Sequence, residues 1–399
     1  MGYKKILIGL IFILLIGCFF FNKKEKETTF TFWTIQLKAP VGDLIQKNID
    51  LFQQKHPEIK IVWVDIPIAE AQKRTIASIL GGNPPDLINL NPEFSSLLAQ
   101  KNSLEYFNEE ETKNYNQNLV NKLKYDKKIY ALPFYATSAI TLKNKEKFKN
   151  CNIQLKTYDD ILKLKNCKNS PIFGIALNEG DSFGKILNKY NINFENLNEK
   201  ELASIYLLFN QMKEEDLLLK DTLTINHREA IEKYMAESAS FITAGSNFIN
   251  IIKENAPNIY EKSEIIPQLI GNNSEYDVSI MNFIIPKKAK NKELAKEFAK
   301  LLLNKENQME LAKKTNVLPV NNEALDDNYF KNCGKKLEEQ ARCIAVKQLN
   351  SPIKKDFGHN NKKEINEIIN KNLETLFYKG KDEFNSKNTI KEIENYIKN

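Results

Sequence analysis

The sequence contains little of what enzymes use for covalent chemistry. Histidine occurs only three times in 399 residues, and neither an H-E-x-x-H nor a C-x-x-C motif is present. The glycine-rich run GGNPPD lacks the G-K-[ST] that would cradle a phosphate. These absences argue against a zinc protease, a thiol oxidoreductase and a P-loop hydrolase. They leave open an exported hydrolase built from scattered acidic residues.

A strong one-sided charge pattern is also missing. The net charge is +7 at pH 7, but the lysines alternate with acids and asparagines, as in KNKEKFKN. A nucleic-acid footprint would need basic residues gathered on one face. The composition therefore predicts a solvated, lysine-rich surface and no nucleic-acid partner.

A long apolar run occurs once, at the N-terminus. Two lysines precede residues 6–16, which are apolar apart from one glycine, and Gly17 and Cys18 follow. Read through Phe21, the run would span roughly 24 Å as a helix, which is less than the roughly 30 Å hydrocarbon core of a membrane. This order of basic, apolar and small residues is typical of a secretory signal. An uncleaved membrane anchor is the alternative.

The segment Leu15-Ile16-Gly17-Cys18 resembles the lipobox of bacterial lipoproteins. The resemblance implies a signal peptide over residues 1–17, a lipidated Cys18 and a tether over residues 18–28. Several acyl chains on one residue would hold the protein at the outer face of the cell membrane. The expected location is therefore extracytoplasmic or periplasmic, with contact to the membrane through the lipid.

Four further cysteines lie at positions 151, 167, 333 and 343. An even number in an exported chain permits disulfides, and the local pairs 151–167 and 333–343 would each close a short loop. The spacing does not match a zinc site. Three connectivities, and free thiols, stay open from the sequence alone.

The first ninety residues predict alternating strands and helices. Strands are expected in TTFTFWTI, IKIVWVDI and PPDLINL because these runs are rich in β-branched and aromatic residues. Apolar residues at three- and four-residue steps predict a helix over residues 41–54, and EAQKRTIASILGG predicts a second helix that ends at its glycines. This order predicts an α/β fold with a largely parallel sheet.

Several segments along the chain resemble the solute-binding proteins of ABC importers, the group that includes maltose-binding protein. They are FTFWT…IDLFQQKHPEIKIVWVDI…ASILGGNPPDLINLN, DKKIYALPFYATSAITLKNKEKFKN, LKTYDDILKL, REAIEKYMAESASFITAGSNFI and IIPKKAKNKELAKEFAKLLLNKENQMELAKKTNVLPVNNEAL. Each motif is weak by itself, but they occur in the family's order over residues 29 to 399.

The resemblance implies a two-lobed periplasmic-binding-protein fold of the class II type, with a ligand cleft between the lobes. The chain would cross between lobes near residues 134–137, 278–283 and 318–322. Lobe 1 would comprise residues 29–136 and 283–319, and lobe 2 residues 137–282 and 320–399. A few hinge residues would let the lobes close around a ligand.

Ligands of open α/β sheets lie at the carboxyl ends of strands, and those positions provide the candidate binding residues. The candidates are Trp33, Gln36, Asn89, Asn91, Tyr135, Thr137, Asn178, Gly245, Ser246 and Asn272. For some of them a structural role is the alternative, such as core packing for Trp33 and turn formation before Pro92 for the two asparagines.

The candidate set is rich in amides and hydroxyls, which can both donate to and accept from the hydroxyls of a sugar. An aromatic face can cover the apolar side of a pyranose. An amino acid would need an arginine for its carboxylate, and the arginines are confined to Arg74, Arg228 and Arg342. The family often has a tryptophan near Asn247, whereas Phe248 stands here, and the chain has two tryptophans in total. This departure weakens the sugar interpretation and favours a mono- or disaccharide, or another polar metabolite, over a large oligosaccharide.

The sequence thus predicts a lipid-anchored, monomeric solute-binding protein that delivers a polar solute, a sugar, to the membrane subunits of an ABC permease. It predicts no enzymatic activity, no cofactor and no metal site. One alternative is a lipoprotein of the same fold that acts as a sensor or surface interaction protein without a transporter. The exported hydrolase is the other.

Overall fold

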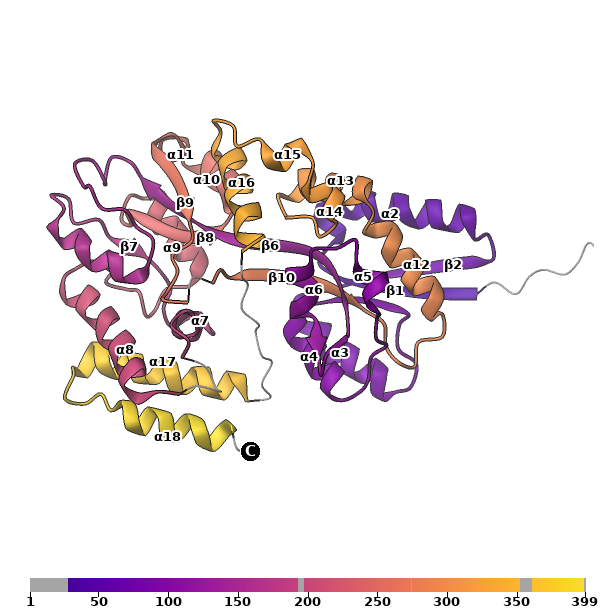
Figure 1. Ribbon diagram of the computed structural model, residues 1–399, viewed down its shortest axis with the longest axis horizontal. Coiled ribbons are helices and arrows are strands. Elements are labelled where there is room, and N and C mark those ends of the chain that lie inside the picture. Colours follow the sequence, from indigo (N-terminus) through magenta and orange to yellow (C-terminus); the bar gives the residue numbers. More distant parts are fainter. Residues whose placement is uncertain (1–27, 193–196, 274, 352–360, 398–399) are drawn as a thin grey trace, which may run out of the picture.

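The computed structural model describes residues 28–192, 197–273, 275–351 and 361–397. The expected signal peptide and the lipidation residue Cys18 lie outside these residues. Within the described ranges, none of the helices combines the length and the apolar character needed to cross a membrane. Two bodies lie side by side, joined by strands that run from one to the other (Figure 1).

Lobe 1 is the body built on the first three strands, β1 (Thr28–Ile35), β2 (Ile59–Ile66) and β3 (Leu87–Leu90), which pair in parallel. They form where β-branched and aromatic residues alternate, so that Phe30 and Phe32 on β1 are both fully buried. The sheet continues antiparallel through β10 (Val278–Ile284) to β6 (Leu132–Asn144), in the order β2-β1-β3-β10-β6. The expected α/β fold is confirmed.

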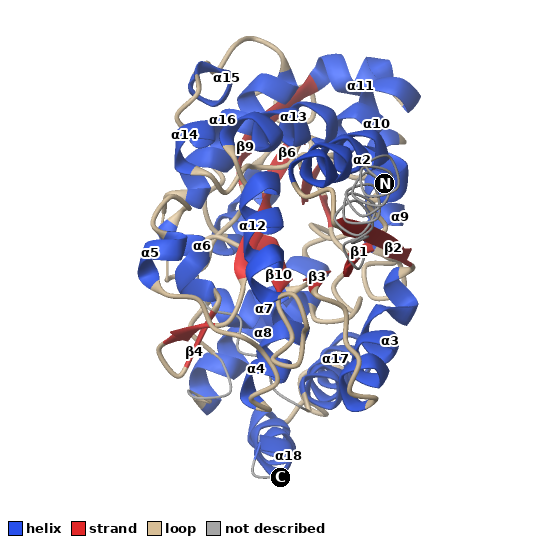
Figure 2. Ribbon diagram, turned by 90° about the vertical axis from the view of Figure 1, so that its right-hand side faces the viewer, coloured by secondary structure: helices blue, strands red, loops and turns tan. Residues whose placement is uncertain are grey.

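Helices cover both faces of this sheet (Figure 2). They include α2 (Lys38–Lys55), α3 (Ile68–Leu80), α4 (Pro92–Gln100), α6 (Gln117–Lys122), α12 (Lys292–Leu302) and α13 (Lys305–Thr315). The first of these starts three residues before the expected position and is kinked at Val41. Its N-terminus is capped from a neighbouring strand, because the Asp65 carboxylate accepts the backbone N–H groups of Leu37 and Lys38, both at 3.0 Å.

Lobe 2 has shorter strands, β7 (Phe173–Gly174), β8 (Phe241–Gly245) and β9 (Ser263–Pro267), arranged around the far half of β6. Its core is formed largely by helices. The elements used below are the 3₁₀-helix η1 (Tyr158–Asn166), α7 (Ser182–Lys189), α8 (Glu199–Glu214), α9 (His227–Met235), α17 (Lys362–Lys379) and α18 (Ser386–Ile397).

The lobes join at the middle of β6. This strand pairs with β10 up to Ser138 and with β8 from Ala139 onward, so it belongs to both lobes. A bridge between Ala136 and Leu318 brings a third segment to the same place. The three segments expected to cross between the lobes therefore lie next to one another.

Helix α16 (Leu337–Leu349) packs on both lobes. Leu337 and Ala341 belong to the core of lobe 2, whereas Ala345 and Leu349 belong to that of lobe 1. Phe330, on the preceding helix α15 (Asn328–Lys331), also packs in lobe 1, although the expected boundary assigns residues 320–399 to lobe 2. The other expected lobe boundaries stay predictions.

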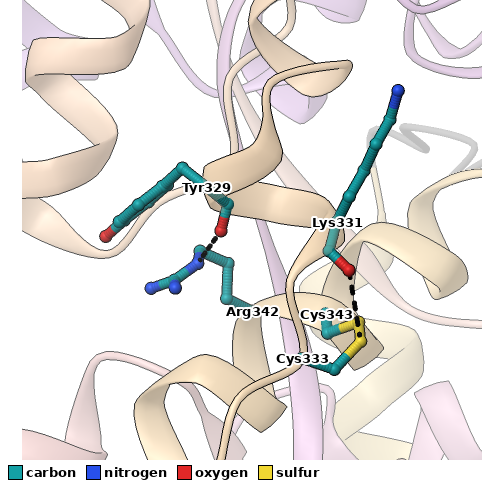
Figure 3. The surroundings of a disulfide bond; sticks show 5 residues. All are labelled: Tyr329, Lys331, Cys333, Arg342 and Cys343. Carbon is teal, nitrogen blue, oxygen red and sulfur yellow. Dashed lines mark hydrogen bonds between the residues drawn. A yellow bond between two sulfur atoms is a disulfide. The ribbon is translucent and has the colours of Figure 1, made fainter.

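The four cysteines form the two local disulfides, Cys151–Cys167 and Cys333–Cys343. The second joins the α15–α16 linker to α16 (Figure 3). Beside it, the Arg342 guanidinium stacks 3.6 Å from the ring centroid of Tyr329 and its Nε donates to the Tyr329 carbonyl. These contacts fasten α15, which packs on lobe 1, to α16, which packs largely on lobe 2.

Candidate functional site

Two adjoining cavities, of about 430 and 350 Å³, lie between the lobes at the middle of β6. They share Lys122, Thr137, Lys185, Val278 and Ser279 as lining residues, so we treat them as one hollow and call it the cleft. Further lining comes from both lobes. Lobe 1 contributes Asn91, Pro92, Glu93, Tyr135, Ile280 and Met281, and lobe 2 contributes Ser138, Ala139, Asp181, Asn188, Lys189, His227, Thr243, Ala244, Gly245, Asn273, Glu275, Tyr276, Asp277 and Lys362.

The lobe 1 side of the cleft combines an aromatic ring with the start of a helix. Tyr135 lies on β6 immediately before the crossing, and burial raises the pKa of its phenol to about 12, so the hydroxyl stays protonated and can donate. Asn91 caps α4, where its side-chain oxygen accepts the Phe94 N–H at 2.8 Å. Asn91 directly follows the end of β3, where an open sheet places its ligands, whereas Tyr135 lies within β6.

The charged groups of the cleft are largely paired with one another. Lys189 lies 2.8 Å from Asp277, Lys185 lies 2.8 Å from Asp181, and Lys362 lies 3.0 Å from the same aspartate. Burial alone would lower the pKa of Lys189, but the Tyr158 and Asp277 groups beside it raise that pKa, so the ammonium persists. The lining therefore carries many charges but little net charge.

One ion pair crosses from lobe to lobe. Lys362, the first residue of α17, lies 3.1 Å from Glu93 in the first turn of α4. The two helices lie on the same side of the molecule, one in each lobe (Figure 1). Burial would lower the pKa of Lys362, but the carboxylates of Asp181 and Glu93 raise it. This pair therefore links the lobes at the rim of the cleft.

His227 stands at the start of α9 and lines the lobe 2 wall. Its backbone N–H donates to Glu179, and its ring meets that of Phe248 edge to face at 5.4 Å between centroids. Burial lowers the pKa of His227, and the nearby Lys185 lowers it further, although Glu179 acts in the opposite direction. The ring is therefore neutral at pH 7, when one nitrogen can donate and the other accept.

Four of the ten predicted binding residues line the cleft, namely Asn91, Tyr135, Thr137 and Gly245. They come from the residue after β3, from the interior of β6 and from the end of β8, and the fold brings them together.

The other six predicted residues do not line the cleft. Trp33 packs against the core beside β3, with the Arg74 guanidinium 6.0 Å from its ring centroid. Asn89 is fully buried and donates to the Asn282 carbonyl, so it links β3 to β10. Gln36 and Asn272 are exposed on loops. None of these four side chains lines the cleft.

The last two are engaged elsewhere in the fold. Asn178 donates to the carboxylate of Glu374 on α17, which ties the loop after β7 to that helix. The Ser246 hydroxyl donates to the Asn316 carbonyl at 3.4 Å, from lobe 2 to lobe 1. We therefore leave Asn178 and Ser246 out of the ligand-facing set.

Sequence reasoning missed the charged residues of the cleft. Lys122, Lys185, Lys189 and Lys362 lie on helices, in a chain where most lysines are solvated. No local signal distinguishes them. Asp181 does lie in a pattern, because residues 180–184 read G-x-S-x-G. That pattern marks a nucleophile elbow only where a strand leads directly into it, and here β7 ends at Gly174 while Ser182 begins α7.

Among the described residues, no group of three or more histidine, cysteine or acidic side chains is arranged to hold a metal ion. The residues that line the cleft offer hydrogen-bond donors and acceptors, paired charges and the rings of Tyr135 and Tyr276.

Comparison with known proteins gives consistent matches. The sequence model of the family described as bacterial extracellular solute-binding protein matches residues 47–336, well over half of the chain. The multiple sugar-binding protein of Streptococcus mutans is 25% identical over 340 residues, which cover 75% of this chain and 78% of that protein.

Solved structures share the fold at low sequence identity. A candidate oligosaccharide periplasmic-binding protein from Synechococcus aligns with a TM-score of 0.79 and 19% identity, covering 92% of this chain and 98% of that chain. Maltose-bound MalE3 of T. maritima aligns with a TM-score of 0.69 and 15% identity, covering 93% and 99%. The two-lobed architecture of these proteins is the one described above.

Proposed function

The chain belongs to the family of bacterial extracellular solute-binding proteins, and we propose that it binds an uncharged sugar in the cleft and delivers it to an ABC importer. The observation that carries this proposal is a hollow at the hinge lined by side chains of both lobes. A ligand held there touches both halves, so it favours the closed state over the open one. A transport partner can then distinguish the loaded protein by its shape.

The mutual pairing of charges supports an uncharged ligand. Three lysines that line the cleft have carboxylates beside them, Lys185 and Lys362 with Asp181 and Lys189 with Asp277. A charged ligand would have to break one of these pairs or add an uncompensated charge. A sugar needs only donors and acceptors, and paired lysines and carboxylates keep hydrogen-bonding capacity toward hydroxyls.

The size and the aromatic content of the cleft support a small sugar. The two adjoining cavities of the cleft, about 430 and 350 Å³, together lie within the range for small-molecule sites, roughly 300–1,000 Å³, and leave room for one or two sugar rings. The ring of Tyr135 can cover the apolar face of one pyranose. We therefore propose a mono- or disaccharide. Its chemical class is also that named for the Streptococcus mutans relative.

The test is a thermal-shift titration of a form lacking residues 1–18 with glucose, maltose, sucrose, glutamate and a dipeptide. At least one sugar should raise the melting temperature, and the shift should increase with sugar concentration. The ligand should add about 2.7 kcal/mol to the free energy of unfolding at a hundredfold excess over the dissociation constant. Tyr135→Leu should weaken the response. The matched control is Tyr125→Leu, since this tyrosine is exposed and outside the cleft. Shifts with glutamate or the dipeptide but no sugar would overturn the sugar assignment.

The membrane attachment is a separate part of the proposal. We propose that Cys18, outside the described residues, carries the lipid that holds the protein near its transporter. Cells fed a labelled fatty acid should label the wild type but not Cys18→Ser. Label in the mutant would contradict the assignment and favour an uncleaved apolar anchor.

A further inference from the structure

The strand β6 changes its neighbour in the middle of the cleft. Ser138 pairs with Val278 of β10, and the next residue, Ala139, pairs with Gly245 of β8. β8 lies on the opposite edge of β6 from β10, and on the β10 edge pairing with β9 begins only at Ile140. Where one neighbouring strand ends and the next has not yet begun, the backbone N–H and C=O groups of β6 lack a strand to hydrogen-bond with. Buried groups of this kind need other hydrogen-bond partners. Ser138 and Ala139 both line the cleft.

Gln348 of α16 provides one such partner. Its side-chain nitrogen donates to the Ser138 hydroxyl and to the Ala139 carbonyl, both at 2.7 Å. Its side-chain oxygen accepts the backbone N–H of Gln268 at 2.9 Å. The residue is 2% exposed and does not line the cleft itself. It therefore holds the hinge strand in place from behind.

Gln268 does the same for the segment that leads into β10. Its side-chain amide forms a two-way pair with the backbone of Asp277, accepting the N–H and donating to the carbonyl, both at 3.0 Å. The same oxygen accepts from the Lys189 ammonium at 2.9 Å. Asp277 and Lys189 both line the cleft, whereas Gln268, also 2% exposed, lies behind them. The amide acts as a substitute for a neighbouring strand.

We infer that Gln268 and Gln348 are positioning residues of the ligand site. Together they fix four cleft residues, Ser138, Ala139, Lys189 and Asp277, without contacting the ligand themselves. This inference rests on the proposed function, since it assigns the two amides to the affinity of the same cleft. A loss of either amide lets part of the wall move and leaves buried peptide groups without partners.

A buried glutamine can also serve stability alone, and the chain contains a matched example. Gln308 on α13 is fully buried, donates to the Phe134 carbonyl at 3.0 Å and accepts the Val320 N–H at 2.8 Å. It joins two of the crossing segments on the lobe 1 side, but neither Phe134 nor Val320 lines the cleft. It has the same chemistry and burial without the contact to cleft residues.

The experiment compares Gln268→Met, Gln348→Met and Gln308→Met in the form lacking residues 1–18. Methionine keeps the length of the side chain and removes its hydrogen bonds. Maltose affinity is measured by calorimetry and the melting temperature without ligand by scanning calorimetry. All three variants should melt lower than the wild type. Only the first two should also lose maltose affinity, by at least about fivefold, the lower end of typical coupling between sites.

Amide hydrogen exchange without ligand gives a second readout that does not depend on sugar binding. In the Gln268 and Gln348 variants, exchange should accelerate at Ala139 and Ser279 as well as at the directly bonded amides. In the Gln308 variant it should accelerate at Val320 and leave the cleft residues unchanged.

The outcomes separate the two proposals. If the wild type binds none of the sugars but exchange accelerates across the cleft as described, the function proposal fails and the positioning of the wall stands. If all three variants change affinity alike, or if faster exchange is confined to the bonded amides, the positioning role of Gln268 and Gln348 is wrong.

Discussion

The two lobes are held together in different ways. In lobe 1, β1 and β2 pair along eight residues, and a cluster of phenylalanines fills the space between sheet and helices. In lobe 2, β7 pairs with β8 over two residues, and the core depends on helices that pack around a short sheet. Both disulfides involve this second lobe or the helix packed on it.

The two lobes also position the residues that line the cleft in different ways. Lobe 1 contributes residues that the sheet positions, because Asn91 directly follows β3 and Tyr135 lies within β6. Lobe 2 supplies most of the lining from helix starts and loops, such as Asp181, His227 and Glu275. Those segments have few ladder bonds, so side-chain contacts must position them. The three predictions below test this contrast, starting with the largest effect.

The phenylalanine core of lobe 1 should show the largest effect. Phe298 is fully buried and meets Phe30, Phe32 and Phe52 edge to face, with centroids at 5.8, 5.3 and 5.2 Å. Phe298→Ala should lower the free energy of unfolding by roughly 3–5 kcal/mol, through lost burial and a cavity. Urea unfolding measures it.

The control for this change is Leu51→Ala, since Leu51 lies on α2 in the same lobe but is 44% exposed. It should change stability by no more than roughly 0.5 kcal/mol. A loss of less than about 1 kcal/mol for Phe298→Ala, below the usual range for such a truncation, would mean that the cluster does not hold lobe 1 together.

The disulfide within lobe 2 should come next. Cys151 and Cys167 are 16 residues apart, and a loop of that size stabilises by about 3 kcal/mol when closed. The double change Cys151→Ser and Cys167→Ser should therefore lower stability by about that amount. Amide exchange should become faster in η1 and β8 but stay unchanged in β1 and β2. If amide exchange became faster to the same extent in both lobes, the disulfide would not stabilise lobe 2 in particular.

Much of lobe 1 could be predicted from the sequence. The runs over residues 28–35 and 59–66 are rich in β-branched and aromatic residues, and both form strands of eight residues. Such patterns are local. The short strand β7 could not be found in this way, because two residues carry no periodicity and owe their conformation to pairing with β8.

Residues that line the cleft could be predicted where they lie at a strand end or in a segment that crosses between the lobes. Gly245 ends β8 and Tyr135 lies in the crossing segment of β6, whereas Asn89 is buried and donates from β3 to β10. Lys362 could not be predicted from the sequence for another reason. Its partner Glu93 is far away in the sequence, and among many solvated lysines nothing marks the one that folding brings to the cleft.

The inter-lobe ion pair provides the smallest and most specific test. Burial would raise the pKa of Asp181, but the charges and hydrogen bonds of Lys185 and Lys362 outweigh this and lower that pKa. A lowered carboxyl pKa stabilises the folded protein above the ordinary value of 3.8, and the contribution is lost as pH falls through the lowered value. The pKa of Lys362 is raised, so its ion pairs stabilise the folded protein at every pH below the ordinary value of 10.5. This stabilisation is lost as the pH rises through the raised pKa.

Lys362→Met should therefore cost up to about 1 kcal/mol at pH 7, less in high salt, and progressively less as the pH falls below the pKa of Asp181. Urea unfolding at pH 7 and pH 3 measures the difference. The control is Lys363→Met, which removes the same charge one residue later, where the side chain is 85% exposed and pairs with Glu367 within α17. Equal losses of stability in the two variants would mean that removing any positive charge there has this effect, and that the ion pairs of Lys362 add nothing specific. A larger effect for Lys362, confined to the higher pH, would show that its ion pairs with Glu93 and Asp181 at the rim of the cleft stabilise the fold.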